Sequence, residues 1–239
     1  MPVARALTRR ELLAGAASVV VSQALAGCGV DTVAAASAND ACVLTAALTE
    51  GPYFVDELLN RSDIRSDPTS GTVSAGTPLL LTFKVSRVAS GGCTPLTGAY
   101  LDVWHCDSAG AYSDVPGAVS GQRFLRGYQV TDADGVARFT TVYPGWYPGR
   151  AVHIHFKLRL FAGATKTYEF TSQFFFEDSL TDTVYTLSPY NTRGTRSTRN
   201  SGDGIYSSLS IAAKGALTLQ TTIDGAGYAG VINLDVNVG

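Results

Sequence analysis

From Thr77 onward the sequence repeats one pattern, in which short runs rich in β-branched and aromatic residues alternate with Gly, Pro, Asp and Ser. Runs of this composition and spacing are typical of strands in an antiparallel sandwich or barrel. Residues 132–135 and 225–227 supply turn residues between neighbouring runs. We therefore predict an all-β domain folded as an antiparallel β-sandwich. Its expected strands are residues 79–88, 99–106, 126–131, 137–142, 152–161, 167–176, 217–223 and 231–238.

Two long stretches interrupt this pattern. Residues 50–72 mix aromatic, charged and turn residues, and residues 185–206 carry Arg193, Arg196 and Arg199 among Ser, Thr, Asn and Gly. Segments of this length in a compact domain are usually functional or disordered. We predict that both are long ordered loops over one end of the sandwich. The three arginines by themselves are more typical of a solvated surface.

The first 27 residues have the layout of an export signal. Arg9 and Arg10 precede an apolar run over residues 12–21, which is too short to span a bilayer. Residues 8–13 resemble a twin-arginine signal. An ordinary amphipathic or core helix is the alternative. We predict an exported protein, located outside the cell or on the outer face of its membrane.

Residues 25–28, Leu-Ala-Gly-Cys, look like a bacterial lipobox, in which cleavage before Cys28 leaves that thiol to carry a lipid anchor. The alternative is a plain signal peptide that is cut nearby. The small, polar residues 28–41 suit a flexible tether. Residues 42–239 then form one globular domain, because a chain that is 45% hydrophobic at this length supplies a single large core.

Charge and cysteine content narrow the class of protein. The formal net charge of −2 offers no electrostatic footprint for nucleic acid. Export favours one disulfide among Cys42, Cys93 and Cys106. The pairing cannot be deduced from the sequence, but Cys42 with Cys93 is favoured because Cys106 falls in an expected buried strand. No Cys/His spacing typical of structural zinc is present in the sequence.

Two of the three histidines, His153 and His155, flank Ile154 inside an expected strand. Side chains alternate along a strand, so both imidazoles lie on one face and Ile154 lies on the other. Two imidazoles side by side on a rigid strand can occupy adjacent positions on one metal ion. Taken alone, the same spacing also suits two exposed strand histidines.

Tyrosines near these histidines sharpen the metal hypothesis. Residues 143–150 form a Pro- and Gly-rich turn that carries Tyr143, Tyr147 and Arg150, and residues 96–112 run down a strand into a turn that ends on Tyr112. A tyrosine phenolate is a hard, anionic oxygen donor whose pKa falls on binding a cation. Two imidazoles with two phenolates favour iron(III) over zinc or magnesium.

These two segments resemble the signatures of the intradiol ring-cleavage dioxygenases, the catechol, hydroxyquinol and protocatechuate dioxygenases. Residues 96–112 (LTGAYLDVWHCDSAGAY) are similar to the first signature, and residues 144–156 (PGWYPGRAVHIHF) are similar to the second metal-binding segment. Weaker similarity extends to residues 49–54 and 171–176. The resemblance covers roughly residues 42–176 and is nearest to the exported, single-domain branch of the family.

The resemblance implies a role for particular residues. Arg150 lies beside the bound ring, Gln173 is a supporting hydrogen-bonding residue, and Tyr147 acts in catalysis as well as in metal binding. Tyr143 is the alternative to Tyr147, and His105 does not match a ligand. The implied iron(III) ligands are Tyr112, Tyr147, His153 and His155, and the implied substrate-binding residues are Gly51, Pro52, Tyr53 and Arg150.

The activity implied by the resemblance is cleavage of a catechol-type ring by O2, between its two hydroxyl-bearing carbons, to a cis,cis-muconate-type diacid. Export suggests extracellular catabolism of aromatic, lignin-derived compounds, with the membrane contacted only through a lipid on Cys28. One alternative is a secreted, non-catalytic β-sandwich module that binds carbohydrate or a cell-wall partner. A second is a cupin-like metalloenzyme, which shares the His-x-His spacing but needs a further histidine and a carboxylate, and only His105 remains.

Overall fold

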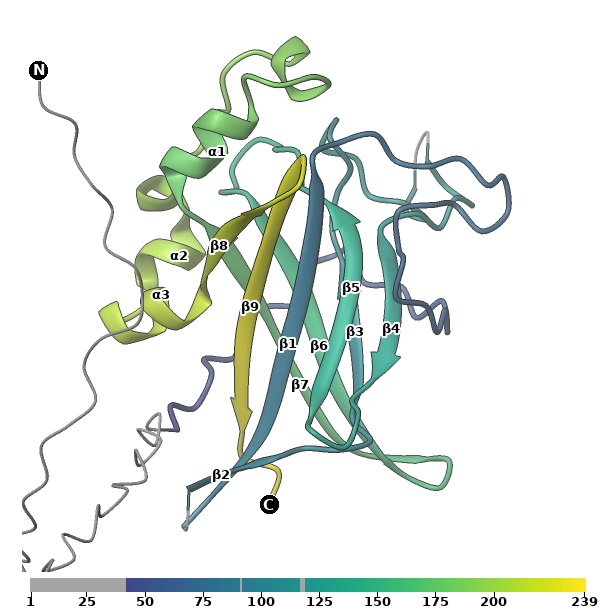
Figure 1. Cartoon of the computed structure of the whole chain (residues 1–239), viewed down its shortest axis with the longest axis vertical. Coiled ribbons are helices and arrows are strands. Elements are labelled where there is room, and N and C mark those ends of the chain that lie inside the picture. Colours follow the sequence, from purple (N-terminus) through teal and green to yellow (C-terminus); the bar gives the residue numbers. More distant parts are fainter. Residues whose placement is uncertain (1–41, 91, 117–118) are drawn as a thin grey trace, which may run out of the picture. The chain divides into compact units, whose positions relative to one another are not determined.

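The computed structural model describes residues 42–90, 92–116 and 119–239, and nine strands of this part carry the architecture (Figure 1). The predicted export signal over residues 1–27, the lipidation site Cys28 and the tether lie outside the described residues. The strands are β1 (Pro78–Ala89), β2 (Gly92–Pro95), β3 (Tyr100–Trp104), β4 (Arg126–Val130), β5 (Val136–Val142), β6 (His153–Ala162), β7 (Thr165–Phe176), β8 (Thr218–Asp224) and β9 (Gly227–Val236).

The strands form one curled, mixed sheet in the order β2-β1-β9-β8-β7-β6-β3-β4, with β5 beside β1. The domain is mostly β, as predicted, but it also has a few short helices, and its mixed sheet differs from the predicted antiparallel sandwich. Two pairs, β1 with β9 and β7 with β8, run parallel. Parallel neighbours need a long crossover connection, and residues 177–217 supply one between β7 and β8. The β1–β9 pair joins strands from opposite ends of the domain, which local sequence patterns cannot reveal.

The main core lies inside the curl of the sheet. In Figure 1, β9, β1 and β5 lie in front and β6 and β7 lie fainter behind them. Phe83 of β1 bridges the two layers, because its ring centroid lies 5.6 Å from that of Phe156 and 6.0 Å from that of Phe174. Each of these side chains is completely buried, so apolar burial holds the curl closed.

Strand β6 has two chemically different faces. Ile154, Phe156 and Leu158 belong to the apolar core. The alternate residues, His153, His155, Lys157 and Arg159, therefore project from the outer side of the curl. In the neighbouring strands Trp104 of β3 and Gln173 of β7 both pair with His155 in register. A row of polar and aromatic side chains thus crosses three strands on the outer face.

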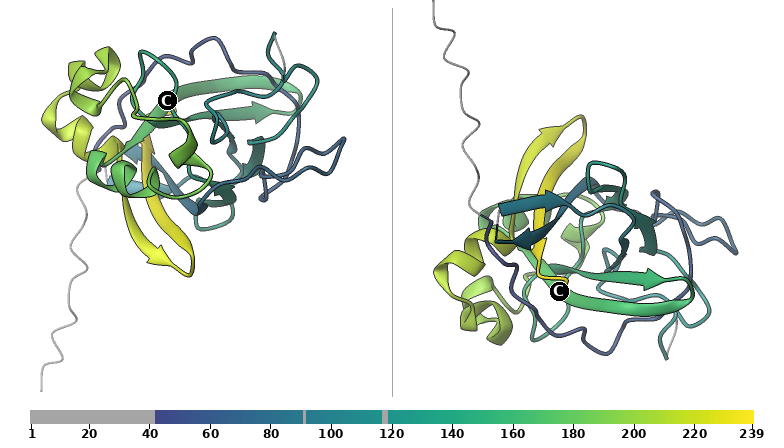
Figure 2. Two further views of the ribbon diagram at one scale, coloured as in Figure 1. Left: turned by 90° about the horizontal axis from the view of Figure 1, so that it is seen from above. Right: turned by 90° about the horizontal axis from the view of Figure 1, so that it is seen from below.

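Short helices follow β7 and gather on one side of the sheet in the views of Figures 1 and 2. Part of this region, residues 185–206, was predicted as loop. Ser210 accepts a hydrogen bond from the Ala213 N–H and caps the last helix. No helix of the described residues is long and apolar enough to cross a membrane. The helices are α1 (Asp178–Val184), η1 (Tyr190–Thr192), η2 (Asn200–Gly202), α2 (Gly204–Ser208) and α3 (Ile211–Leu217).

Residues 43–57, which we call the strap, run from β9 past β7 and reach the outer-face side chains of β6. A disulfide joins Cys42 to Cys93, the pairing that the sequence favours, with the two Cα atoms 5.7 Å apart. The Leu48 N–H donates to the Thr171 carbonyl at 3.0 Å. Further along the strap, Phe54 lies over the Lys157 ammonium group, 4.0 Å from ring centroid to nitrogen. These contacts fix the strap against the row of outer-face side chains.

Two buried cations of β6 also hold the strap. Lys157 pairs with Glu50, and Arg159 pairs with Asp56 at 2.5 Å and with Asp102 of β3 at 2.8 Å. The Lys157 and Arg159 side chains are only 5% and 8% exposed. Because a buried charge without a partner is costly, each pair favours the docked position of the strap.

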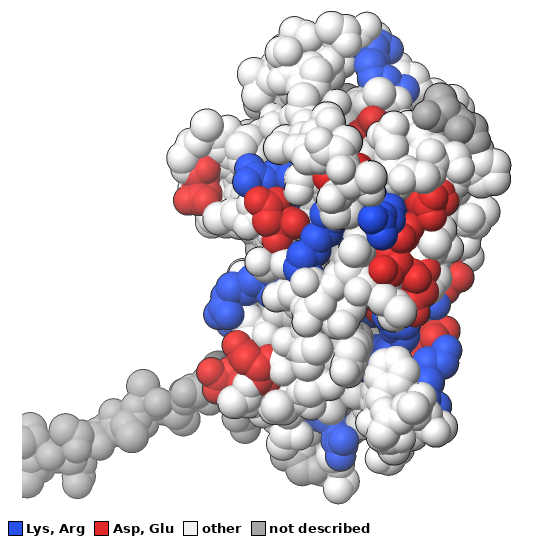
Figure 3. All heavy atoms as spheres, turned by 90° about the vertical axis from the view of Figure 1, so that its right-hand side faces the viewer, with Lys and Arg blue, Asp and Glu red and all other residues white. Residues whose placement is uncertain are grey.

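Elsewhere the surface charge is mixed in sign. On the face drawn in Figure 3, Lys and Arg side chains lie beside Asp and Glu side chains rather than in a patch of one sign. Exposed pairs such as Arg65 with Asp63, at 2.8 Å, follow the same pattern. Pairs of this kind add little to stability.

Candidate metal centre

The imidazoles of His153 and His155 face each other at the start of β6. Their Nε2 atoms lie 3.0 Å apart, and their ring planes are 80° from parallel. His153 Nδ1 lies 2.6 Å from the Ala151 carbonyl oxygen, which can only accept, so Nδ1 carries the proton and Nε2 carries a lone pair. Burial lowers the pKa of His153 to about 3 and the pKa of His155 well below its usual value.

Two tyrosines meet these histidines. The Tyr147 hydroxyl lies 3.0 Å from His153 Nε2, and the Tyr112 ring centroid lies 5.8 Å from that of Tyr147 and 6.2 Å from that of His155. Burial raises the pKa of Tyr147 to about 12 and that of Tyr112 well above its usual value. The structure therefore brings together all four side chains that the sequence predicted as metal ligands.

The arrangement fits a bound cation. Tyr112 Oη is buried and has no hydrogen-bond partner among the described residues, which is costly for a polar atom unless something else binds it. Two nitrogens held at about 2.1 Å by one ion, at a right angle, lie about 3 Å apart, close to the separation of the two Nε2 atoms. A cation would also lower the raised pKa of each phenol and favour phenolate donors.

The other candidate ligands lie elsewhere. Tyr143 is completely buried, bonds through its hydroxyl to Thr181 at 2.7 Å and packs against Phe176. His105 has both ring nitrogens occupied, by the Cys106 carbonyl at 2.8 Å and the Thr141 hydroxyl at 2.7 Å. Within the described residues no cluster of three or more His, Cys, Asp or Glu side chains is placed to hold a metal. The geometry favours Tyr147 over Tyr143 and gives His105 a structural place.

His155 is held between an indole and a glycine. The Trp104 ring stacks on the imidazole at 5.0 Å and 8°. On the strap, a Cβ built on Gly51 would lie 3.5 Å from His155 Cε1, and the φ of Gly51 is +70°. A side chain at Gly51 would strain the backbone because of the positive φ, and its Cβ would lie in van der Waals contact with the ring. The position of Trp104 beside His155 is a supporting contact that sequence reasoning missed.

Arg150 is oriented by two partners. Its Nε donates to Asp203 at 2.8 Å, one Nη donates to the Gln173 side-chain oxygen, and the other Nη lies 3.4 Å from His153 Nε2. Gln173 also donates to the Thr49 carbonyl at 3.2 Å, so it links Arg150 to the strap. These contacts hold the guanidinium group at the edge of the metal centre.

Asp203 is a further residue that sequence reasoning missed. It is completely buried and accepts from the backbone N–H groups of Ala151, Ile205 and Tyr206. Burial opposes its ionisation, but these hydrogen bonds and Arg150 keep its pKa below the usual value. The only sequence signal was an Asp placed to cap a short helix, which does not indicate a partner 53 residues away.

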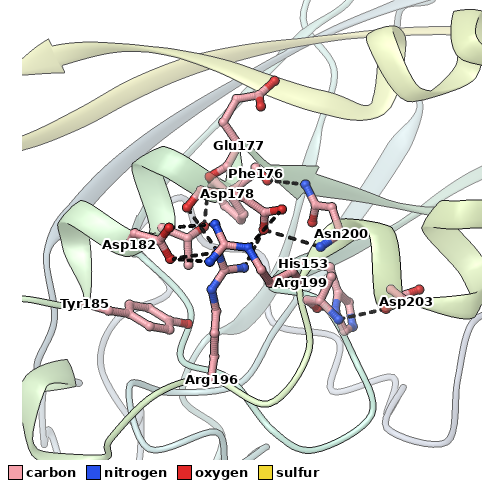
Figure 4. Close-up of polar contacts among 12 residues, drawn as sticks. His153, Phe176, Glu177, Asp178, Asp182, Tyr185, Arg196, Arg199, Asn200 and Asp203 are labelled. Atoms are coloured by element: carbon pink, nitrogen blue, oxygen red, sulfur yellow. Dashed lines mark hydrogen bonds and ion pairs between the residues drawn. The ribbon is translucent and has the colours of Figure 1, made fainter.

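A network of side chains supports the segment that carries Asp203 (Figure 4). Arg196 donates to Asp178 at 2.5 Å and to Asp182 at 2.9 Å, and Asn200 donates to the Phe176 carbonyl at 2.8 Å. The Arg196 side chain is only 3% exposed. The expectation that the arginines of this stretch are solvated is therefore wrong for Arg196, because two carboxylates from α1 compensate its burial.

A pocket of about 470 Å³ adjoins the phenols of Tyr112 and Tyr147. Tyr53 of the strap forms one wall and stacks on Tyr112 at 4.5 Å and 25°. Pro52, also predicted to bind substrate, is exposed and is not among the residues that line the pocket. Of the three predicted strap residues, Tyr53 thus reaches the pocket and Gly51 reaches His155.

Comparison with known proteins agrees with this fold. The family model described as Dioxygenase matches residues 49–187. The protocatechuate 3,4-dioxygenase beta chain of Burkholderia cepacia is 36% identical over 104 residues, 38% of this chain and 44% of the relative. The chlorocatechol 1,2-dioxygenase of Rhodococcus opacus is 30% identical over 100 residues, 42% of this chain and 38% of the relative. The chain thus spans less than half the length of these curated relatives.

Among solved structures, an intradiol ring-cleavage dioxygenase from Tetranychus urticae superimposes with a TM-score of 0.69 at 30% identity, over 82% of this chain and 95% of that one. The curled mixed sheet is therefore the fold of these enzymes. The family match covers more than half of the chain, and the chain belongs to the intradiol ring-cleavage dioxygenase family.

Proposed function

We propose that this chain is a non-haem iron(III) enzyme that cleaves a catechol with O2 between the two hydroxyl-bearing carbons, giving a cis,cis-muconate-type diacid. The observation that carries the proposal is the convergence of two imidazoles and two phenols, one of them with an unpartnered buried oxygen. Tyr112, Tyr147, His153 and His155 would hold the ion. Bound iron(III) would draw electron density from a coordinated catechol and make a ring carbon reactive toward O2.

Tyr147 is suited to move a proton as the substrate binds. It lines the pocket and is the less buried of the two phenols. Its pKa in the protein is raised to about 12, so a Tyr147 phenolate released into this site takes a proton readily from a catechol hydroxyl. Proton transfer to Tyr147 Oη would leave the substrate anionic without adding net charge to the buried site.

Arg150 is suited to stabilise negative charge on the substrate ring. Asp203 and Gln173 fix its guanidinium before any substrate binds, so little reorganisation is needed as charge develops. The strap, with Gly51 beside His155 and Tyr53 stacked on Tyr112, covers part of the centre. These residues bind and orient the ring, and Tyr147 accepts its proton.

The test is oxygen uptake and product analysis with catechol on the full chain after loading with iron(III). We expect one O2 consumed per ring opened, and a red-brown colour from phenolate-to-iron charge transfer. Tyr147→Phe should weaken the colour and lower kcat by about 100-fold or more, whereas Tyr143→Phe, the matched control, should leave both unchanged. A colourless, inactive protein after iron loading would favour the non-catalytic binding module instead.

We further propose that the protein is exported and anchored through lipid on Cys28, so that it acts on aromatic, lignin-derived compounds outside the cell. The twin-arginine-like segment and the lipobox-like residues 25–28 support this location. Labelling with a radioactive fatty acid in a bacterial host tests it. We expect label on the parent chain and none on Cys28→Ser, and equal labelling of the two would refute the anchor.

A further inference from the structure

The pocket beside the phenols is lined mainly by apolar surface and carries no charged side chain among the described residues that line it. Among the described lining residues the only side-chain polar atoms are the hydroxyls of three tyrosines, and Val115 and Val119 add apolar wall. Small residues, Gly110 and Ala111, form another part. A substituent on a bound ring therefore meets aliphatic and aromatic surface. The described lining is Tyr53, Gly110, Ala111, Tyr112, Val115, Pro116, Val119, Tyr147 and Pro148.

The guanidinium group of Arg126, which contacts the pocket wall through Tyr53, already has hydrogen-bond partners. Arg126 is 3% exposed, and its head group donates to the Ser113 hydroxyl at 2.8 Å, to the Ser113 carbonyl and to the Tyr53 carbonyl at 3.3 Å. At the metal centre, Arg150 is paired with Asp203. Arg126 therefore presents no free edge for a substrate carboxylate, and Arg150 is not among the described residues that line the pocket. A carboxylate in this pocket would lose hydration without gaining an ion pair, which is unfavourable.

The pocket is also larger than a catechol ring requires. Its volume is about 470 Å³. Catechol itself, with eight non-hydrogen atoms, fills only part of that space. Apolar surface left unfilled by the substrate gives no binding energy, whereas an added apolar group that covers it does.

We propose that the preferred substrates are catechols that carry an uncharged, apolar ring substituent, and that carboxylated catechols are poor substrates. This inference rests on the proposed function and specifies its substrate class. Each methylene of the substituent that becomes buried should raise kcat/KM about fourfold, the equivalent of about 0.8 kcal/mol. A carboxylate should lower kcat/KM by about 100-fold or more relative to a neutral group of the same size.

A size-matched pair of substrates tests the charge directly. We would measure kcat/KM for 3,4-dihydroxybenzoate and for its methyl ester, with catechol and 4-ethylcatechol as references. The ester and 4-ethylcatechol should exceed catechol, and the acid should fall far below the ester. Binding of the unreactive monophenols, 4-hydroxybenzoate and its methyl ester, separates affinity from ring electronics and should show the same order.

A charge placed in the pocket should reverse the preference. Val115→Arg should raise kcat/KM for the acid relative to the ester by about tenfold or more, whereas Val115→Met, which adds bulk without charge, should not. Equal or better turnover of the acid by the parent chain would overturn the substrate class and leave the dioxygenase proposal intact. Loss of turnover with all four catechols would instead remove the proposed function itself.

Discussion

The two faces of β6 are both buried from His153 to Arg159, but one makes apolar contacts and the other makes polar contacts. On the inner face, Ile154, Phe156 and Leu158 pack in the apolar core inside the curl of the sheet. On the outer face, His153 and His155 meet phenols and an indole, and further along the strand cations meet carboxylates. Burial on the inner face is favourable by itself, whereas the buried cations of the outer face are tolerated because carboxylates pair with them. Exposure alone therefore does not separate core from site in this molecule.

The largest expected effect comes from removing a donor on the outer face. His155→Ala should lose bound iron and lower ring cleavage by roughly 1,000-fold or more, since one of four proposed donors is gone. Iron content per chain and oxygen uptake measure both losses. The apo forms of parent and variant should melt at similar temperatures, which shows that the fold survives. A variant that still binds one iron per chain would remove His155 from the ligand set.

On the inner face the expected effect is on stability. Phe156→Ala should lower the free energy of unfolding by about 4 kcal/mol, because it leaves a cavity where three rings meet. Urea unfolding measures the change. Phe161, at the far end of the same strand, is 37% exposed, so Phe161→Ala serves as the matched control and should cost about 1 kcal/mol or less. Equal losses of unfolding free energy in the two variants would show that the buried contacts of Phe156 stabilise the fold no more than the exposed ones of Phe161.

Further along the outer face, the prediction concerns compensated charge. Arg159→Met removes the cation between Asp56 and Asp102 and should lower the free energy of unfolding by about 3 kcal/mol, because Asp102 stays buried without its partner. Arg65→Met, at an exposed ion pair, should change it by less than about 0.5 kcal/mol. If Arg159→Met were as mild as Arg65→Met in urea unfolding, the outer face would need no charge compensation.

The smallest expected effect concerns the buried imidazole of His105 and the pH dependence of the unfolding free energy. Burial lowers the pKa of His105 to about 4, below the ordinary value of about 6.5. The unfolded chain then takes up a proton in acid before the folded chain does. Stability from neutral His105 is complete above about pH 6.5 and declines as the pH falls toward 4, by about 2 kcal/mol at pH 5.

His105→Gln removes this titration. The difference in unfolding free energy between pH 7.5 and pH 5 should shrink by about 2 kcal/mol in the variant, measured with urea at both pH values on iron-loaded protein. An unchanged difference would show that His105 binds its proton equally well in both states.

Local sequence patterns predicted the strands well. Alternation placed His153 and His155 on one face of a strand, and the structure agrees. The errors concern partners that are distant in the chain. Parallel pairing of β1 with β9 depends on how the two ends of the domain meet, and Asp203 reaches Arg150 across 53 residues. The helices were missed because they are short, and the seven residues of α1 include three β-branched residues, which are weak helix formers.

The disulfide between Cys42 and Cys93 determines how tension on the preceding chain enters the domain. A pull applied ahead of Cys42 passes through the sulfur bridge into the β1–β2 hairpin. Residues 43–57 then run on the unloaded side of that bridge, so Gly51 and Tyr53 keep their places over His155 and Tyr112. The bridge therefore keeps a load on the preceding chain away from residues 43–57.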